Sequence, residues 1–234
     1  MSAANDQDVP VRLVGGLAVR LRADEAFHTG LSRVYKDIDY VTLRGKSKQV
    51  IAFMESMGYQ PNREFNGFNG HERLLFYDNP NQRQVDVFVG AFRMCHEIPI
   101  TDRIHLDATT VPLAELLLTK LQIVQLNEKD MRDIVALVHH HDVAEHDGDT
   151  INAAYIARLC AGDWGLWRTC KMNITRTRDG LDGFDIASHE RDEVEARLDR
   201  LWQRIESQPK SRGWKLRDRI GDRKQWYEEP EEVG

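Results

Sequence analysis

The chain has 234 residues, of which 41% are hydrophobic and 30% are charged, and its formal net charge is −6 at pH 7. This is enough apolar material for a substantial core, but no apolar run reaches the ~20 residues that span a bilayer. A strongly acidic balance would disfavour non-specific nucleic-acid binding, but this balance is mild and unevenly distributed along the chain. Because the three cysteines show no zinc-site spacing and the first ten residues form no apolar or basic leader, we expect a cytoplasmic protein without a signal peptide or a membrane partner.

The first predicted element is a short buried strand, Val11 to Val14, which Gly15 and Gly16 follow directly. Two glycines after a strand allow positive φ angles and let the backbone approach a ligand closely. Residues 17–21 can continue as a helical turn, and backbone N–H groups at a helix start attract phosphate. The pair therefore suggests a phosphate-binding turn, and its plain alternative is a structural glycine turn.

A second strand is predicted over residues 37–43, and it opens with Asp37 and Asp39. Side chains two apart on a strand point to the same side, so the two carboxylates project together. Neighbouring carboxylates repel each other unless a cation lies between them, and Mg²⁺ is a hard cation that prefers oxygen ligands. The pattern suggests a magnesium site, with a solvated acidic strand end as the alternative.

The next elements frame a third carboxylate. We predict a helix over residues 45–58, a loop over 59–70 because its Asn-Gly pairs favour tight turns, and strands over 72–77 and 84–89. Asp86 lies in the last of these strands, among valines. A buried acid is costly unless it is paired or bound to metal. The alternative is an edge strand on which Asp86 faces water.

Two helices follow in the sequence. The first, which begins near Pro112, is apolar almost all round, so we predict that it is buried, with Lys120 as its lone cation. Near a magnesium site such a lysine could bind a triphosphate, and the alternative is a side chain that extends to solvent. Asn127 is predicted to cap the second helix, which carries Asp130 and Asp133.

Taken in order, the Gly-Gly turn, the Asp-x-Asp pair and Asp86 resemble the nucleotidyltransferase superfamily typified by DNA polymerase beta. The segment from Lys120 to Asp133 resembles the AbiEii-like nucleotidyltransferases of bacterial toxin–antitoxin and abortive-infection systems. The resemblance covers about residues 11–138. It implies an α/β (α+β) nucleotidyltransferase fold, in which a small mixed sheet is flanked by helices and followed by a helical C-terminal region.

The resemblance also implies an activity, which is Mg²⁺-dependent transfer of a nucleoside monophosphate from an NTP such as ATP to an acceptor hydroxyl. The glycines would cradle phosphates, the first three aspartates would hold Mg²⁺, the lysine would stabilise triphosphate charge, and the last aspartate would orient a basic group such as that lysine. In chain order, these residues are Gly15, Gly16, Asp37, Asp39, Asp86, Lys120 and Asp130.

The acceptor stays open at the level of sequence. RNA such as a tRNA end, or a protein hydroxyl, would suit a toxin-like role with an antitoxin protein as partner. A small hydroxylated molecule would suit an enzyme similar to the aminoglycoside and lincosamide nucleotidyltransferases. A different class is a non-catalytic nucleotide-binding module. That alternative gains if the three carboxylates do not converge within roughly 4–5 Å of one another.

We expect two domains, a catalytic one over residues 1–141 and a helical one over 150–234, with a polar linker between them. His139, His140 and His141 are interpreted as a solvated helix end. The basic stretch from Arg197 to Lys224 could meet RNA phosphates or form a solvated helix face. The tail aromatics could stack on bases or pin the tail to its domain, and we expect the second.

Overall fold

The computed structural model describes residues 1–23, 31, 35 and 37–229. The chain divides into two compact units. The first comprises Met1–Leu21, Val34–Arg93 and Glu97–Pro112, and the second comprises Arg22–Arg33, Met94–His96 and Leu113–Gly234. The predicted class is confirmed at this level, because a five-stranded mixed sheet with flanking helices is followed along the chain by a helical C-terminal region.

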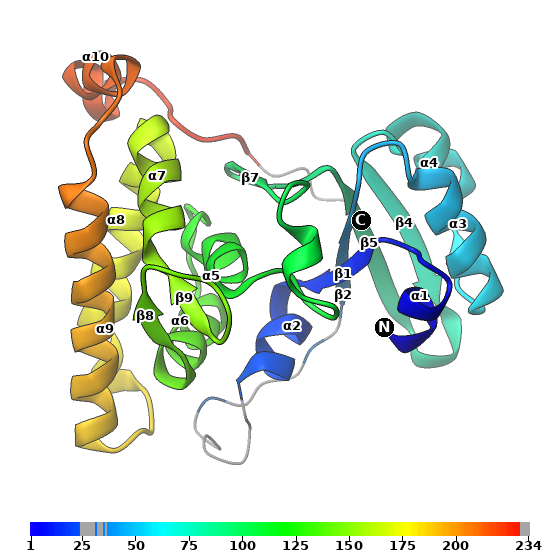
Figure 1. The fold of residues 1–234 in the computed structure, drawn as a ribbon, viewed down its shortest axis with the longest axis horizontal. Coiled ribbons are helices and arrows are strands. Elements are labelled where there is room, and N and C mark those ends of the chain that lie inside the picture. The colour runs from blue at the N-terminus through cyan, green and yellow to red at the C-terminus, as the bar shows by residue number, and fades with distance from the viewer. Residues whose placement is uncertain (24–30, 32–34, 36, 230–234) are drawn as a thin grey trace. The chain divides into compact units, whose positions relative to one another are not determined.

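Five strands form the sheet of the first unit, in the spatial order β1-β2-β5-β4-β3 (Figure 1). They are β1 (Val11–Val14), β2 (Ile38–Thr42), β3 (Gln60–Pro61), β4 (Arg73–Asp78) and β5 (Arg83–Val89). β2 and β5 run parallel, and the other neighbouring pairs are antiparallel. β5 is therefore the central strand, and it reads as a nearly continuous apolar run because both of its faces are buried.

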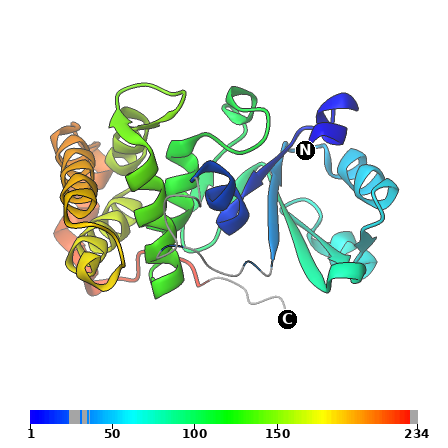
Figure 2. The same cartoon turned by 90° about the horizontal axis from the view of Figure 1, so that it is seen from below.

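Four α-helices lie before β1 or between the strands β1 to β4 in the described part of the chain. They are α1 (Ser2–Asp6), α2 (Gly15–Arg22), α3 (Ser47–Ser56) and α4 (Arg63–Asn69). α3 buries Val50, Phe53 and Met54, as its apolar spacing predicts. α3 and α4 lie beside β3 and β4 in both views of the ribbon (Figure 1, Figure 2). A small hairpin of β6 (Ala91–Arg93) and β7 (Glu97–Pro99) follows β5.

The expectation of a loop over residues 59–70 is wrong, because α4 and β3 occupy it. Asn62 caps α4 by accepting a hydrogen bond from Phe65 N at 3.0 Å. Asn66 then bonds Leu75 of β4 twice: its Oδ1 accepts from Leu75 N at 2.7 Å, and its Nδ2 donates to Leu75 O at 3.1 Å. The first Asn-Gly pair therefore serves a contact with β4 and does not form a hairpin turn.

The second unit is built from helices and one small parallel strand pair. Its elements are α5 (Leu113–Leu121), α6 (Glu128–His140), β8 (Asp142–Ala144), β9 (Thr150–Asn152), α7 (Ala153–Gly162), α8 (Trp164–Asp179), α9 (Ser188–Ser207) and α10 (Arg212–Ile220). Every residue of α5 is buried, as its apolar circumference predicts. α6, α7, α8 and β9 surround it.

The units divide at Pro112 and Leu113, which differs from the expected division between residues 141 and 150. The expected linker contains β8, which pairs with β9 through Val143 and Ile151, both buried. The interpretation of residues 139–141 as a solvated helix end is also wrong for His141, which is 2% exposed. Its Nε2 lies 3.0 Å from Arg22 O, and burial lowers its pKa below the ordinary 6.5.

The C-terminal tail is pinned to its own unit, as expected. The Trp226 indole N–H donates to Thr169 Oγ1 at 3.0 Å, and the Trp226 ring meets Trp164 edge to face at 6.2 Å. Arg217 stacks over Trp164 at 4.4 Å. These contacts place the tail aromatics in packing, where they are not free to stack on bases.

Candidate functional site

The glycine turn and the Asp-x-Asp pair meet in the first unit. In the antiparallel pairing of β1 with β2, Val14 stands opposite Asp39, so the chain turns into α2 directly beside the Asp39 carboxylate. Gly15 has a φ of +71°, and a Cβ atom built on it would lie 2.2 Å from Asp39 Oδ2. Only glycine satisfies both the backbone angle and the space at this position. The predicted association of the two motifs is therefore present in the fold.

Asp37 and Asp39 differ in their surroundings. Asp37 is exposed and directly precedes β2, whereas Asp39 is half-buried as the second residue of that strand. Ile38, between them, is buried. The strand thus begins one residue later than predicted, and one carboxylate lies in solvent while the other lies against the glycine turn.

Asp86 lies opposite Asp39 in the parallel pairing of β2 with β5, so the two side chains share one face of the sheet. Asp86 is 3% exposed and belongs to the central strand, and the alternative of an edge-strand acid facing water is wrong. Arg73 Nε donates to its Oδ1 at 2.8 Å, and Gln84 Nε2 donates to its Oδ2 at 2.9 Å. The cost of burying this acid is therefore offset by an ion pair.

Arg73 and Gln84 are site residues that the sequence analysis missed. Gln84 lies two residues before Asp86 on β5, so it shares the face of Asp86. Arg73 stands opposite Phe88, also two residues from Asp86, and its guanidinium lies 5.2 Å from the Phe88 ring centroid. The arginine that opens β4 was visible in the sequence, but only the register of the β4–β5 pairing shows that it reaches Asp86.

A magnesium site of three protein carboxylates is not formed by the part of the chain that the structure describes. No group of three or more His, Cys, Asp or Glu side chains there is arranged to hold a metal ion, and both oxygens of Asp86 accept protein hydrogen bonds. Mg²⁺ is, however, usually held by one or two carboxylates together with substrate phosphates. Asp37 and Asp39 fit that smaller ligand set, and Asp86 fits a supporting place beside it.

Lys120 and Asp130 meet in the second unit. Lys120 is 8% exposed, and its Nζ lies 3.3 Å from Asp130 Oδ1 and 2.9 Å from Asp133 Oδ2. The predicted cap of α6 holds this arrangement, because Asn127 Oδ1 accepts from Asp130 N at 3.1 Å. The lysine is therefore paired within its unit, and the alternative of a side chain that extends to solvent is wrong. Asp133, 2% exposed, is the closer partner and was not predicted.

No protein-family model, curated protein or solved structure matches the chain. In addition, no helix among the described residues combines the length and apolar character needed to cross a membrane. Function therefore has to be argued from the chemistry of the site, since a fold class alone does not carry it.

Proposed function

We propose that the chain is a Mg²⁺-dependent nucleotidyltransferase that moves a nucleoside monophosphate from an NTP to an acceptor hydroxyl. The observation that carries the proposal is the contact between Gly15 and Asp39, which joins a helix-opening glycine turn to an Asp-x-Asp carboxylate. Phosphoryl-type transfer depends mainly on positioning and charge neutralisation, and this contact supplies groups for both.

In this proposal each residue has a limited task. Asp37 and Asp39 would hold Mg²⁺, which when bound would neutralise triphosphate charge. Gly15 and Gly16 would present backbone N–H groups of the α2 start to phosphate oxygens. The acceptor hydroxyl releases its proton to solvent, its oxygen forms the new bond to the α-phosphorus, and pyrophosphate leaves with the electron pair of the broken bond. Asp86 would position Arg73, whose side chain is 25% exposed, on the face of the sheet that carries Asp39.

Lys120 belongs to the second unit, and the triphosphate role that the resemblance implies for it stays a proposal. Its two carboxylate partners, Asp130 and Asp133, keep the ammonium in one position. Because these two carboxylates also balance its charge, Lys120 carries less of the proposal than Asp37 and Asp39 do.

A non-catalytic nucleotide-binding module is the second candidate, and a specific observation favours it. Asp86 is bound by Arg73 and Gln84, and the described residues form no three-ligand metal group. In that case Asp37 and Asp39 would bind a metal–nucleotide complex without transfer. The two candidates share a ligand and differ in whether a labelled nucleotide becomes covalently attached.

RNA is the acceptor that we favour, on the strength of exposed cations in α10 and just after it. Arg200 and Arg204, earlier in the basic stretch, are used in ion pairs with Asp142 and Glu145. In contrast, five basic residues are exposed and make no ion pair within the described residues: Arg212, Lys215, Arg219, Arg223 and Lys224. Phosphate backbones bind such unpaired cations. A protein hydroxyl and a small hydroxylated molecule are the alternative acceptors.

The experiment incubates purified protein with Mg²⁺ and each of four α-labelled NTPs, with total RNA or a cell extract as the source of acceptor. The test variant is Asp37→Asn/Asp39→Asn. The matched control is Asp6→Asn/Asp8→Asn, which makes the same change at the same spacing in the same unit.

Label on RNA that disappears in the test variant and persists in the control supports the proposal and the RNA acceptor. Label on protein, or only on small molecules, keeps the transferase and replaces the acceptor. Nucleotide binding without any labelled product supports the non-catalytic module. Full transfer by the test variant would show that the assignment of Asp37 and Asp39 is wrong.

A further inference from the structure

The first unit contains a pocket that none of the residues discussed above lines. Its volume is about 800 Å³, which lies within the range of roughly 300–1,000 Å³ typical of small-molecule sites. Arg44 and Val89 place it beyond the carboxyl ends of the parallel strands β2 and β5, where Gly90 N donates to Thr42 O at 2.7 Å. Ligands of open α/β sheets commonly bind at such strand ends.

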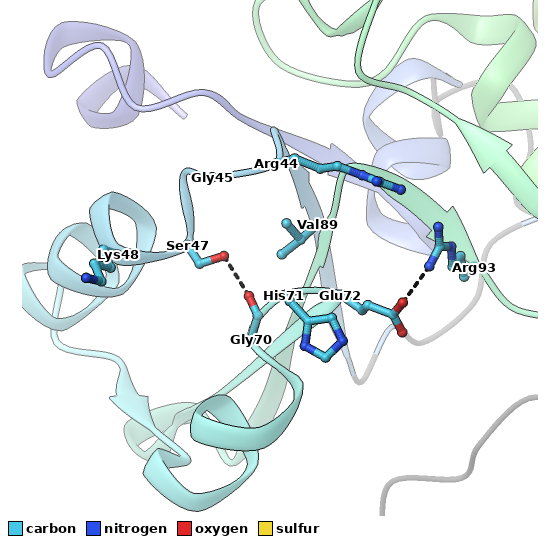
Figure 3. Close-up of a pocket in the computed structure, with 9 residues that line it drawn as sticks. All are labelled: Arg44, Gly45, Ser47, Lys48, Gly70, His71, Glu72, Val89 and Arg93. Atoms are coloured by element: carbon cyan, nitrogen blue, oxygen red, sulfur yellow. Dashed lines mark hydrogen bonds and ion pairs between the residues drawn. The ribbon is translucent and has the colours of Figure 1, made fainter.

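The lining of the pocket is basic (Figure 3). Arg44, Lys48, His71 and Arg93 contribute to it, and Glu72 is its one carboxylate. Glu72 Oε1 accepts from Arg93 at 2.7 Å, and Arg93 also pairs with Glu97, so the charge of Arg93 is neutralised within the protein.

The remaining basic groups are uncompensated. Among residues 1–23, 31, 35 and 37–229, no carboxylate pairs with the side chains of Arg44, Lys48 or His71. Figure 3 shows the Arg44 guanidinium directed toward that of Arg93, and Lys48 on α3 at the opposite end of the lining, with its ammonium turned away from Arg44. Unpaired cations at opposite ends of one cavity suit an extended anion that carries more than one charge.

The Arg44 side chain lies against Gly90. Gly90 has a φ of +83°, and a Cβ atom built on it would lie 2.5 Å from Arg44 Cγ and 2.7 Å from Arg44 Nε. The Arg44 side chain therefore lies across the backbone of Gly90, just after β5. Any residue other than glycine at position 90 would place a Cβ atom against this side chain.

The start of α3 adds backbone donors to the same pocket. α3 has ten residues, carries no acid in its first turn, and its N-cap Lys46 makes no side-chain hydrogen bond to it. The Ser47 hydroxyl donates to Gly70 O at 2.6 Å, which ties the helix start to the segment that carries His71. First-turn N–H groups without a side-chain cap favour an anion.

From these observations we propose that the pocket binds a small ligand through a phosphate group, with Arg44 and Lys48 as its principal contacts. Asp37 and Asp39 lie at the other, amino-terminal end of β2, so this site does not depend on the proposed transferase activity. The pocket is large enough for a nucleotide-sized molecule, and its cations suit a di- or triphosphate better than a single phosphate.

The test measures binding of three probes, inorganic phosphate, pyrophosphate and ATP, by titration calorimetry at fixed ionic strength with EDTA present. Wild type is compared with Arg44→Gln/Lys48→Gln. The matched control is Arg83→Gln, an exposed arginine that opens the strand which Val89 ends. All these positions are exposed, so the variants are expected to fold. Spectra of histidine-labelled protein report in parallel whether the His71 ring senses each probe.

We expect the double variant to bind pyrophosphate or ATP at least tenfold more weakly, with loss of the His71 response, and Arg83→Gln to bind as wild type does. Equal affinity in the double variant and the control would overturn the proposal, as would wild-type protein that binds none of the three probes. ATP binding that is lost in Asp37→Asn/Asp39→Asn but kept in the double variant would also overturn it. Binding confined to an RNA oligonucleotide would replace the small ligand with nucleic acid.

Discussion

Arg73 Nε lies 2.8 Å from Asp86 Oδ1, and the carboxylate of this pair is 3% exposed whereas the arginine side chain is 25% exposed. Replacing Arg73 with methionine leaves an uncompensated charge at the centre of the sheet. We therefore expect Arg73→Met to lower the free energy of unfolding by about 3–5 kcal/mol, as for other broken buried pairs. Urea denaturation followed by circular dichroism measures it.

The control for that variant is the exposed pair of Arg63 and Glu55, whose arginine side chain is 87% exposed. Arg63→Met should cost no more than about 1 kcal/mol. A second variant, Arg73→Met/Asp86→Leu, removes both charges and should recover most of the loss, because apolar replacement of a whole buried pair is often neutral. If Arg73→Met costs no more than Arg63→Met, the pair does not offset the burial of Asp86.

Gly15 is expected to tolerate no side chain. Gly15→Ala forces a Cβ atom against Asp39 Oδ2 and strains a φ of +71°, so it should displace the carboxylate. Gly58 is a matched control, since its φ is +88° and its missing Cβ would meet nothing within 4 Å. Gly58→Ala should therefore cost only the conformational part, about 1 kcal/mol. We expect Gly15→Ala to cost at least twice that and to abolish nucleotide transfer. Equal costs would mean that the contact with Asp39 is unimportant.

Much of the fold follows from local pattern. Val11–Val14 forms β1 as predicted, Asn127 caps α6, and the stripe of Val194 and Leu198 in α9 is fully buried. These features depend on residues close in sequence, so periodicity and capping rules reach them. α4 was missed for the opposite reason, because the role of Asn66 depends on its two bonds to Leu75 across a turn of the chain.

The residues of the candidate site also fall into those that local sequence predicts and those that it does not. Gly15 and Asp39 were predicted because turn chemistry and strand alternation are local, and the register of β1 with β2 then brought them together. The partner of Asp86 could not be predicted, because choosing Arg73 requires the pairing of β4 with β5. The basic pocket was missed since Arg44, His71 and Val89 come from separate segments, none of which carries a motif.

Acid is expected to destabilise the second unit. Burial lowers the pKa values of His96, His139 and His141 below 6.5, against the opposing influence of nearby carboxylates such as Asp149 beside His141. Each folded histidine therefore stays neutral at a pH where the unfolded chain binds a proton. The stability is fully present above pH 6.5 and is lost as the pH falls through the lowered pKa values, at up to about 1.4 kcal/mol per pH unit for each histidine.

Tryptophan fluorescence measures this loss selectively, because all five tryptophans lie in the second unit. Urea unfolding at pH 7.5, 6.5 and 5.5 should show falling stability in wild type and a smaller slope in His141→Asn. The exposed His189, in the same unit, gives the control variant, His189→Asn, which should keep the wild-type slope. Identical slopes in the two variants would show that His141 is not one of the groups responsible.

If RNA is the acceptor, the exposed cations of α10 should set its salt dependence. Lys215 and Arg219 lie four residues apart on one side of that helix, with the exposed Leu216 between them in sequence, and neither pairs with a carboxylate of the described chain. Each cation that contacts a single-stranded phosphate contributes about 0.7 to the slope of log affinity against log salt. Lys215→Gln/Arg219→Gln should therefore reduce that slope by about 1.4 and weaken binding at low salt, without altering sequence preference.

Arg200→Gln removes a cation that Asp142 already pairs, so it serves as the control and should leave the slope unchanged. Filter binding of labelled RNA at several salt concentrations measures both variants, and equal slopes in wild type and the double variant would remove α10 from the RNA site.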